Sequence, residues 1–270
     1  MKPVAAAQDR RVNVLGVGVN VTSLREAVTM VERWICQRAK HYVCITGAHG
    51  VMESRRDDAL RGILNQAGMV TADGMSLVWF SRLVRNAPAE RVYGPDLMRA
   101  LMAISPERGY RHFCYGGPPG VAEKLKDAME ATYPGVTIVG TLSPPFRELT
   151  PDEDSAIVAR INAACPDIVW VGLSTPKQEF WMARHLGRID APVMIGVGAA
   201  FDFLAGTKRQ APQWMQRNGL EWLFRLLTEP RRLWRRYLYI VPGFALLTAR
   251  ELAARALRLD LPRAHSAGPK

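Results

Sequence analysis

Several features that would point to common protein classes are missing from this 270-residue sequence. Its four cysteines have no C-x-x-C spacing and no histidines at zinc-site intervals, so we expect free thiols and no disulfide framework. A run of about eighteen apolar residues, the length that spans a bilayer, does not occur. Residues 1–11 contain no apolar segment either. We therefore expect no spanning helix and no secretory signal, which fits a reduced cytoplasmic protein.

Motifs for a nicotinamide cofactor are also missing. The first strand-like segment leads into Gly16-Val17-Gly18 and lacks the fingerprint G-x-G-x-x-G. No tyrosine is followed by a lysine four positions later. These absences argue against an NAD-dependent sugar-nucleotide oxidoreductase or epimerase, which remains the alternative enzyme class.

Residues Asp152, Glu153 and Asp154 superficially resemble a metal-binding D-x-D motif. They follow Thr150 and Pro151, and Thr-Pro-x-Glu is the pattern of a capped helix start. We therefore interpret this acidic run as a helix N-terminus, and we predict no metal site and no cofactor.

Positive charge is concentrated at one end of the chain. The net charge is +11, and residues 206–270 hold thirteen Lys and Arg against four Asp and Glu. Such asymmetry favours an anionic partner: phospholipid headgroups, a diphosphate or nucleic acid. A non-enzymatic basic module that binds membrane or nucleic acid is therefore a further alternative, although it does not explain the polar residues at strand ends.

Strand-like and helix-like segments alternate through the first 205 residues. Helical periodicity follows Ser23 up to about Ala39, and similar helical segments separate most of the apolar runs. Continuous apolar runs of this kind are typical of buried parallel strands. We predict an α/β, Rossmann-like core with a mostly parallel sheet covered by helices. The predicted strands are residues 12–17, 41–46, 69–72, 111–115, 136–140, 167–172 and 193–198.

Polar residues follow several of these strands. Asp73 stands where a strand-like run ends and a helix-like run begins, and Gly74 after it allows close approach of a ligand. A helix N-cap is the alternative role for Asp73. Because ligands of open α/β sheets bind at the carboxyl ends of the strands, we expect Asp73 to share one crevice with other strand-end residues. These are Thr46, Gln178 and Asp202.

Weaker candidates accompany this set. Gly116 and Gly117 form a glycine-rich turn before a helix, where backbone N–H groups can receive a phosphate. His49 follows a strand end and could face a ligand there. The alternative interpretation is that it belongs to an ordinary strand-to-helix turn. The remaining candidates lie in first helical turns after strands or turns, and they are Asp96, Lys177 and Glu179.

Residues 206–270 are predicted to form a basic amphipathic helical appendage. Pro230 should end one helix, and four arginines then precede the apolar residues 237–247. Arginines beside a short apolar run match a helix that lies in the membrane interface, and a solvated basic face on a core helix is the alternative. We expect a core that folds without this appendage. The four arginines are Arg231, Arg232, Arg235 and Arg236.

Motifs from about Val12 to Tyr239 give the sequence a family resemblance. It resembles the WecG/TagA/CpsF family of bacterial glycosyltransferases, and several motifs occur in the family's order. They are Thr71-Ala72-Asp73-Gly74-Met75, Val92-Tyr93-Gly94-Pro95-Asp96-Leu97, Thr175-Pro176-Lys177-Gln178-Glu179, Gly196-Val197-Gly198-Ala199-Ala200-Phe201-Asp202, Gly219-Leu220-Glu221-Trp222-Leu223-Phe224-Arg225 and Glu229-Pro230-Arg231-Arg232.

The resemblance implies a metal-independent, inverting transfer from a UDP-sugar to a polyprenyl-diphosphate-linked saccharide at the cytoplasmic membrane face. Members of the family build wall teichoic acid linkage units, enterobacterial common antigen and exopolysaccharides. It implies that Asp73 is the general base, with Thr46 and Gln178 near it. It also implies that the donor nucleotide or its diphosphate is held by three residues, which are Arg91, Asp202 and Arg225.

The chemistry of this transfer explains the residue types. One carboxylate suffices to take the proton of the acceptor hydroxyl. Without a metal, arginines must stabilise the leaving diphosphate, and we assign Arg225, Arg232 and Arg235 to this task. The partners would then be the UDP-sugar, the polyprenyl-linked acceptor and an anionic membrane surface, without nucleic acid.

One departure from the family pattern affects the donor. Many members have Thr-Pro-Asn where this chain has Thr46-Gly47-Ala48, which removes an amide beside the sugar. The version found here is more like the exopolysaccharide branch. The donor is therefore left open between UDP-glucose and UDP-N-acetylmannosamine, and so are the acceptor, the linkage and assembly into a homo-oligomer.

Overall fold

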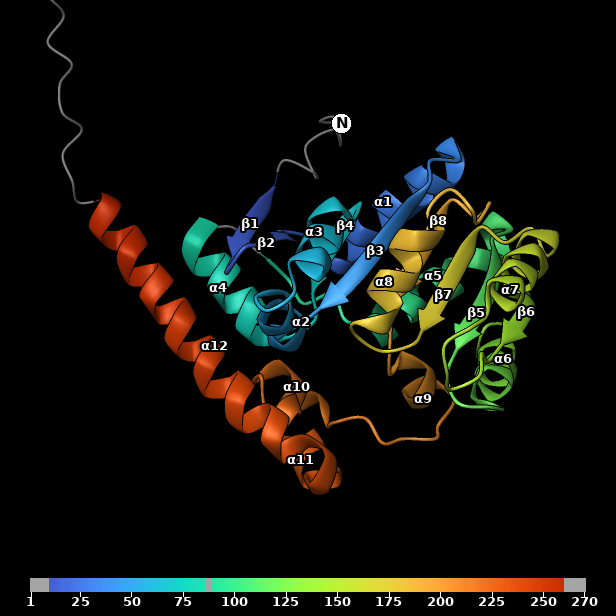
Figure 1. Ribbon diagram of the computed structural model, residues 1–270. Coiled ribbons are helices and arrows are strands. Elements are labelled where there is room, and N and C mark those ends of the chain that lie inside the picture. The colour runs from blue at the N-terminus through green and yellow to red at the C-terminus, as the bar shows by residue number, and fades with distance from the viewer. Residues whose placement is uncertain (1–9, 86–88, 260–270) are drawn as a thin grey trace, which may run out of the picture.

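A six-stranded parallel sheet forms the centre of the protein (Figure 1). The computed structural model describes residues 10–85 and 89–259. The strand order is β4-β3-β8-β7-β5-β6, and every neighbouring pair is parallel. This architecture confirms the predicted Rossmann-like α/β class. The strands are β3 (His41–Thr46), β4 (Met69–Ala72), β5 (Arg111–Gly116), β6 (Thr137–Leu142), β7 (Ile168–Gly172) and β8 (Val193–Gly196).

Successive side chains of a strand point to opposite faces of the sheet, and in these strands the side chains on both faces are apolar. Helices therefore cover both faces. In β7, for example, Val169 and Val171 belong to one hydrophobic cluster and Ile168 and Trp170 to the other. The first cluster is covered by α2 (Ala48–Ser54), α3 (Asp58–Gln66), α4 (Met75–Arg85), α7 (Pro151–Ala163) and α8 (Lys177–His185). The second is covered by α1 (Leu24–Gln37), α5 (Gly94–Arg108), α6 (Val121–Thr132) and α9 (Ala200–Leu204).

The predicted helix starts are confirmed by their caps. Ser23 and Glu26 form a reciprocal capping box at α1, and Thr150 and Glu153 form one at α7. Asp154 in the same turn binds His185, with 2.9 Å between Oδ1 and Nε2. In the part of the chain that the structure describes, no three His, Cys, Asp or Glu side chains gather as a metal site would require.

The prediction of a single opening strand at residues 12–17 was wrong. This segment contains a separate antiparallel hairpin, β1 (Arg11–Val14) and β2 (Val17–Asn20). Leu15 and Gly16 make its turn with φ values of 52° and 97°, because a two-residue type I′ hairpin turn requires positive φ at both central residues. The side-chain oxygen of Asn13 accepts the Gly16 N–H at 2.8 Å. The turn was missed because apolar valines flank it on both sides.

The strand predicted at residues 136–140 exists, but it differs in burial. It forms β6 at the edge of the sheet, and most of its residues are only partly buried. Its apolar composition had predicted a strand covered on both faces.

The C-terminal segment forms α10 (Gln213–Arg217), α11 (Glu221–Thr228) and α12 (Pro230–Leu259). Pro230 separates two helices, as predicted, because it begins the 30-residue α12. Figure 1 shows α10 and α11 below the carboxyl ends of the strands and α12 running beside α4 and the β1–β2 hairpin. Measured over the described residues, every helix is too short or too polar to cross a bilayer.

α12 also contributes to the hydrophobic core. Ile240 and Phe244 are buried in the cluster that contains the hairpin valines. Farther along, Glu251 accepts the Leu15 N–H at 3.2 Å and Arg255 donates to the Asn13 carbonyl at 2.9 Å. Deleting the appendage after Ala205 would remove these contacts and expose part of the core. Point substitutions therefore test the role of the appendage more cleanly.

Candidate active site

Thr46 and Asp73 lie side by side at the carboxyl edge of the sheet. Thr46 is the last residue of β3 and Asp73 follows the neighbouring strand β4, and the Asp73 N–H donates to the Thr46 carbonyl at 2.8 Å. A Cβ atom built on Gly47 would stand 4.0 Å from Asp73 Oδ2, so the two strand-end turns are in contact. Thr46 is 2% exposed, whereas the Asp73 side chain is 32% exposed. Asp73 is thus the more accessible of the pair.

Gln178 and Glu179 reach the same edge from the first turn of α8. Both are buried, at 2% and 0% exposure. One carboxylate oxygen of Glu179, Oε1, accepts the Thr175 hydroxyl at 2.9 Å and the Gln178 amide N–H at 3.1 Å. A Cβ atom on Gly196, at the end of β8, would stand 3.1 Å from the Gln178 amide. Gln178 therefore packs against the strand next to β3.

Five buried polar atoms around this edge have no hydrogen-bond partner among the residues that the structure describes. Buried polar groups are nearly always paired, so a group of unpaired ones at a strand edge points to a ligand. Four of the five atoms are oxygens. They are Thr46 Oγ1, Asp73 Oδ1, Gln178 Oε1, Glu179 Oε2 and Arg225 Nε.

The electrostatic surroundings of Asp73 suit a proton acceptor. Removal from water, reinforced by the negative charge of Glu221, raises its pKa to about 6, although Arg91 and Arg225 oppose the shift. Its Oδ1 accepts no hydrogen bond from the described residues, so this oxygen does not cap a helix. A carboxyl with a pKa near neutrality is the kind of group that general base catalysis needs.

Arg91 joins this edge to the appendage. Its guanidinium donates to the Asp73 carbonyl, to Gln216 at 2.9 Å and to Glu221. The guanidinium also lies over the Tyr93 ring, 4.0 Å from its centre. Arg91 had been implied in donor binding, and here three of its five N–H groups donate to the protein itself. Its position 3.9 Å from Asp73 Oδ1 still adds positive charge to the site.

Arg225 is the arginine of the appendage that stands closest to this network. One of its N–H groups donates to Glu221 at 2.8 Å, and its guanidinium faces the Phe203 ring at 5.4 Å. Burial lowers its pKa, but Glu221 together with Tyr93 and Asp73 raises it above its usual value, so Arg225 remains a cation. Its Nε is the unpaired donor of the group.

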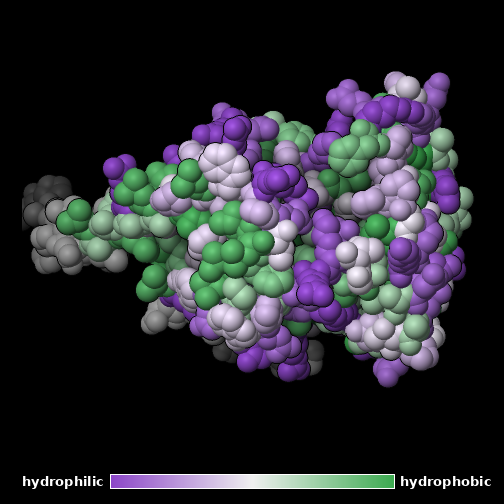
Figure 2. Space-filling view, turned by 90° about the horizontal axis from the view of Figure 1, so that it is seen from below, coloured by the Kyte–Doolittle hydropathy of each residue, from purple (hydrophilic) through white to green (hydrophobic). Residues whose placement is uncertain are grey.

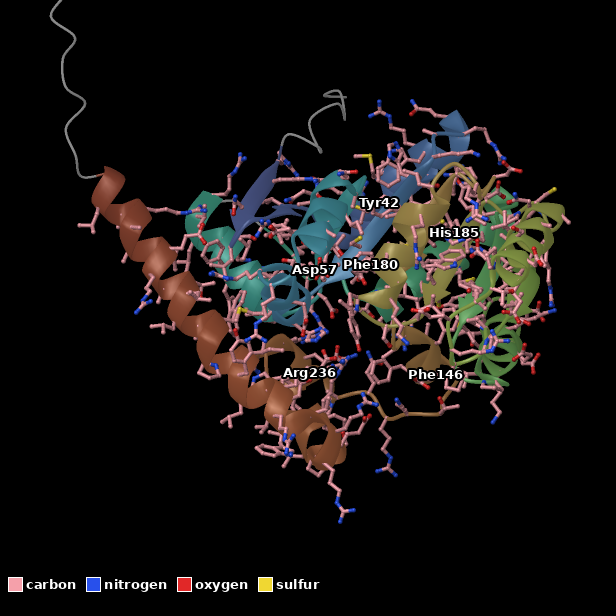
Figure 3. The ribbon with its side chains drawn as sticks, in the orientation of Figure 1. Tyr42, Asp57, Phe146, Phe180, His185 and Arg236 are labelled. Atoms are coloured by element: carbon pink, nitrogen blue, oxygen red, sulfur yellow. The ribbon has the colours of Figure 1, made fainter. Side chains whose placement is uncertain are left out.

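The other predicted arginines lie farther out. Arg232 is exposed and pairs with Glu229 at 2.7 Å, while Arg235 lies over the Trp234 ring at 5.2 Å. Arg236, which the sequence had not singled out for the site, acts electrostatically on His49 and Tyr237. Figure 3 shows it where α12 passes below α2. Helical spacing alone could have found it, because Arg232 and Arg236 share one face.

Asp202 and Lys208 fasten the start of the appendage. Asp202 accepts the Thr207 hydroxyl at 3.1 Å and pairs with Lys208 at 3.4 Å, and Lys208 also reaches Glu229 at 3.8 Å. Lys208 was missed because it is one of many cations in this segment. Asp202 is not among the unpaired group.

The weaker candidates occupy the periphery of the site. His49 pairs with Glu53 at 3.4 Å, and Asp96 pairs with Arg99 at 3.2 Å while its charge adds to the raised pKa of Asp73. Lys177 lies over the fully exposed Phe146 ring at 5.1 Å, at the other end of the strand edge (Figure 3).

Gly116 and Gly117 end β5, which three strands separate from β4 and Asp73. A Cβ atom on Gly116 would strike the main chain of Gly172, and both glycines have positive φ. Close packing of β5 on β7 thus requires glycine at position 116, and the positive φ favours glycine at position 117.

Comparison with known proteins identifies what this chain resembles. The model of the glycosyl transferase WecG/TagA/CpsF family matches residues 12–258. The chain is 28% identical over 227 residues to an N-acetylglucosaminyldiphosphoundecaprenol N-acetyl-beta-D-mannosaminyltransferase of Staphylococcus aureus, strains NCTC 8325 and COL. The alignment covers 83% of this chain and 87% of that enzyme.

Proposed function

Because the chain belongs to the glycosyl transferase WecG/TagA/CpsF family, and is thus a glycosyltransferase, we propose that it transfers a sugar from a UDP-sugar to a polyprenyl-diphosphate-linked saccharide. The observation that carries this proposal is the group of unpaired buried polar atoms around Asp73, beside the arginines of the appendage. Family membership counts against the alternatives of a nicotinamide-dependent enzyme and a non-enzymatic basic module.

The proposed reaction is a single inverting displacement. Asp73 takes the proton of the acceptor hydroxyl, whose oxygen attacks the anomeric carbon, and UDP leaves from the opposite face of the sugar. Arg225 stabilises the diphosphate as its charge grows, and Arg232 and Arg236 extend the positive field on the next helix, α12. No metal ion is needed in this scheme, because guanidinium groups bind phosphate oxygens in pairs.

A donor panel tests the proposal. The purified protein is incubated with a polyprenyl-diphosphate monosaccharide and either UDP-glucose or UDP-N-acetylmannosamine, and released UDP is measured with and without EDTA. We expect one donor to release UDP only when the acceptor is present, and EDTA to leave the rate unchanged. Release with neither donor contradicts the proposed function. Loss of activity in EDTA that magnesium or manganese restores contradicts metal independence alone.

Gly50 in α2 provides a test of the Thr46 hydroxyl. A Cβ atom at this position would overlap Thr46 Oγ1 and lie 3.8 Å from Thr175. We expect Gly50→Ala to rotate Thr46 and to lower kcat/KM about tenfold, the worth of one hydrogen bond to substrate. Thr46→Ala should cause a similar loss, and the double variant should be no worse than either single change.

Gly62→Ala is the matched control for this pair. Its added Cβ would meet only the end of the Gln66 side chain at 4.0 Å, and alanine favours a helix over glycine. It should keep full activity and unfold at the same or a higher temperature. Additive losses in the Gly50–Thr46 double variant would show that Gly50 does not act through the Thr46 hydroxyl.

The appendage is proposed to dock on an anionic membrane at the cytoplasmic face. Large apolar side chains stand exposed on α10, α11 and α12, and three exposed arginines lie among them. Figure 2 shows hydrophobic groups gathered over α11 and α12, with hydrophilic groups beside them. Apolar groups flanked by arginines suit an interfacial helix. This apolar surface comprises Trp214, Leu227, Trp234 and Leu238, and the arginines are Arg231, Arg232 and Arg235.

Replacing two of these groups, Leu227→Glu with Leu238→Glu, should weaken binding to vesicles that contain anionic lipid by tenfold or more. The change removes apolar area that membrane binding would bury, and it adds repulsion between the glutamates and the anionic lipid. The residual electrostatic binding should fall further as salt is raised. Co-sedimentation measures this. Leu186→Glu, at the opposite end of α8 from the strand edge, is the control that should bind like wild type. Unchanged binding of the double variant would show that this surface does not face the membrane.

A further inference from the structure

The hydrogen bonds of Glu179 determine which way the Gln178 amide points. A carboxylate can only accept hydrogen bonds, and its Oε1 receives both the Thr175 hydroxyl and one Gln178 N–H. The nitrogen of the amide must therefore face Glu179. If Glu179 is protonated, as its raised pKa in this buried place favours, the unpaired Oε2 can carry the proton and Oε1 still accepts both bonds.

The carbonyl oxygen of Gln178 consequently points away from Glu179 and has no partner within the described chain. A Cβ atom built on Gly198 would have this oxygen as its nearest neighbour at 3.6 Å, with Ser174 next at 3.9 Å. The oxygen therefore lies beside the turn that follows β8, at the carboxyl edge of the sheet. A hydroxyl or amide N–H group of a ligand would supply the proton that the oxygen lacks.

The neighbouring unpaired atoms have the same preference. The Asp73 carboxylate only accepts hydrogen bonds, and the Thr46 hydroxyl can also accept one. A diphosphate brings acceptors and negative charge, so these oxygens would repel it, whereas Arg225 and Lys208 on the appendage would attract it. The core side of the site therefore suits the hydroxyl-rich part of a substrate.

We infer that Glu179 is a positioning residue, which holds the Gln178 amide so that its carbonyl oxygen accepts a hydrogen bond from a sugar hydroxyl or acetamido N–H. The inference rests on the proposed glycosyl transfer. In this role Glu179 acts through the amide of Gln178. Because Glu179 fixes the amide, the Gln178 carbonyl oxygen can pair only with a hydrogen-bond donor. The site therefore favours sugars that carry a hydroxyl or N–H group at this position.

Deoxy and deoxyfluoro analogues of the donor and acceptor sugars read out the direction of the amide. Fluorine keeps the size of a hydroxyl and accepts weakly, but it has no proton to donate. At the position that meets Gln178, the wild-type enzyme should lose about tenfold in kcat/KM with either analogue, the worth of one hydrogen bond. Because each analogue has the same intrinsic reactivity with every variant, changes in their ratio report the contact. Whether the donor or the acceptor series shows the effect identifies the sugar.

Glu179→Met replaces the carboxylate acceptor by an apolar side chain of similar length. Filling a buried ionic site with an apolar group often preserves folding. The amide is then free to turn its N–H groups to the substrate. We expect the parent sugar to lose several-fold in kcat/KM and the fluoro analogue to become clearly better than the deoxy analogue. Glu179→Gln keeps an acceptor oxygen for Thr175 and Gln178, so it should restore the wild-type ratio. Glu130→Met, on the exposed face of α6, is the control for the substitution itself.

Other outcomes separate this inference from the function. Wild-type fluoro-to-deoxy ratios in Glu179→Met at every position of both sugars would overturn the positioning role while leaving glycosyl transfer intact. If Glu179→Met does not fold, Glu179→Asp withdraws the oxygen by one methylene and should change the ratio in the same direction. No turnover of any UDP-sugar by the wild-type protein would instead overturn the proposed function.

Discussion

Asp73→Asn is expected to lower turnover by a factor on the order of 10²–10⁴ while folding and UDP affinity stay nearly unchanged. Asparagine has the shape of aspartate but cannot accept the proton of the acceptor hydroxyl. The loss should therefore appear in kcat, measured as UDP release at saturating donor and acceptor. Thermal unfolding and a UDP titration check that the variant is otherwise intact.

The pH dependence of the wild-type enzyme should follow the same group. Burial and Glu221 raise the pKa of Asp73 to about 6, and only the deprotonated carboxylate can act as a base. We expect kcat/KM to be constant above this pH and to fall about tenfold per unit below it. A carboxyl with an ordinary pKa near 4 would keep the rate level down to about pH 4.

Asp58→Asn is a control for the substitution, because Asp58 is exposed on α3 and, among the described residues, forms an ion pair with Arg61 alone. It should leave both the rate and the pH profile unchanged. Turnover of Asp73→Asn within a few-fold of wild type would remove Asp73 from the role of base. A structural role at the start of α4 would then be the better interpretation of this residue.

Arg225→Ala should lower kcat/KM by a factor on the order of 10²–10³, as loss of one preorganised group that stabilises developing charge does. Arg225 is cationic, it stands beside Asp73 and Glu221, and its Nε is free to meet the diphosphate. Arg225→Lys keeps the charge without the paired donors and should recover only part of the loss. The assay uses a water-soluble acceptor, so that membrane binding plays no part.

Two further variants show whether the loss comes from the site. Arg250→Ala removes an exposed arginine from the same appendage and should have no effect. Glu221→Gln removes the charge that links Arg225 to Arg91, so it tests the docking of the appendage on the core. If Arg225→Ala transfers sugar to a soluble acceptor at the full rate, the appendage serves only as an anchor and its arginines take no part in catalysis.

The parts of this protein that could be predicted from sequence depend on local interactions. The capping boxes of α1 and α7 involve residues three positions apart. The strands of the sheet follow from continuous apolar runs, because both faces of most strands are covered. The hairpin escaped prediction because its turn residues lie among valines. The strand β6 was predicted, but its partial burial was not, because an edge position is not encoded in one strand's own composition.

The sequence by itself determined the α/β alternation and the presence of Asp73, Thr46 and Gln178 at strand ends, since both follow from periodicity along the chain. Only the tertiary structure decided how their side chains are used. Arg91 meets Glu221 across 130 residues, Arg225 keeps an unpaired Nε at the site, and Glu179 turns the Gln178 amide. Such choices depend on which charged and polar groups the folded chain brings within hydrogen-bonding distance, and that distance is unrelated to separation in sequence.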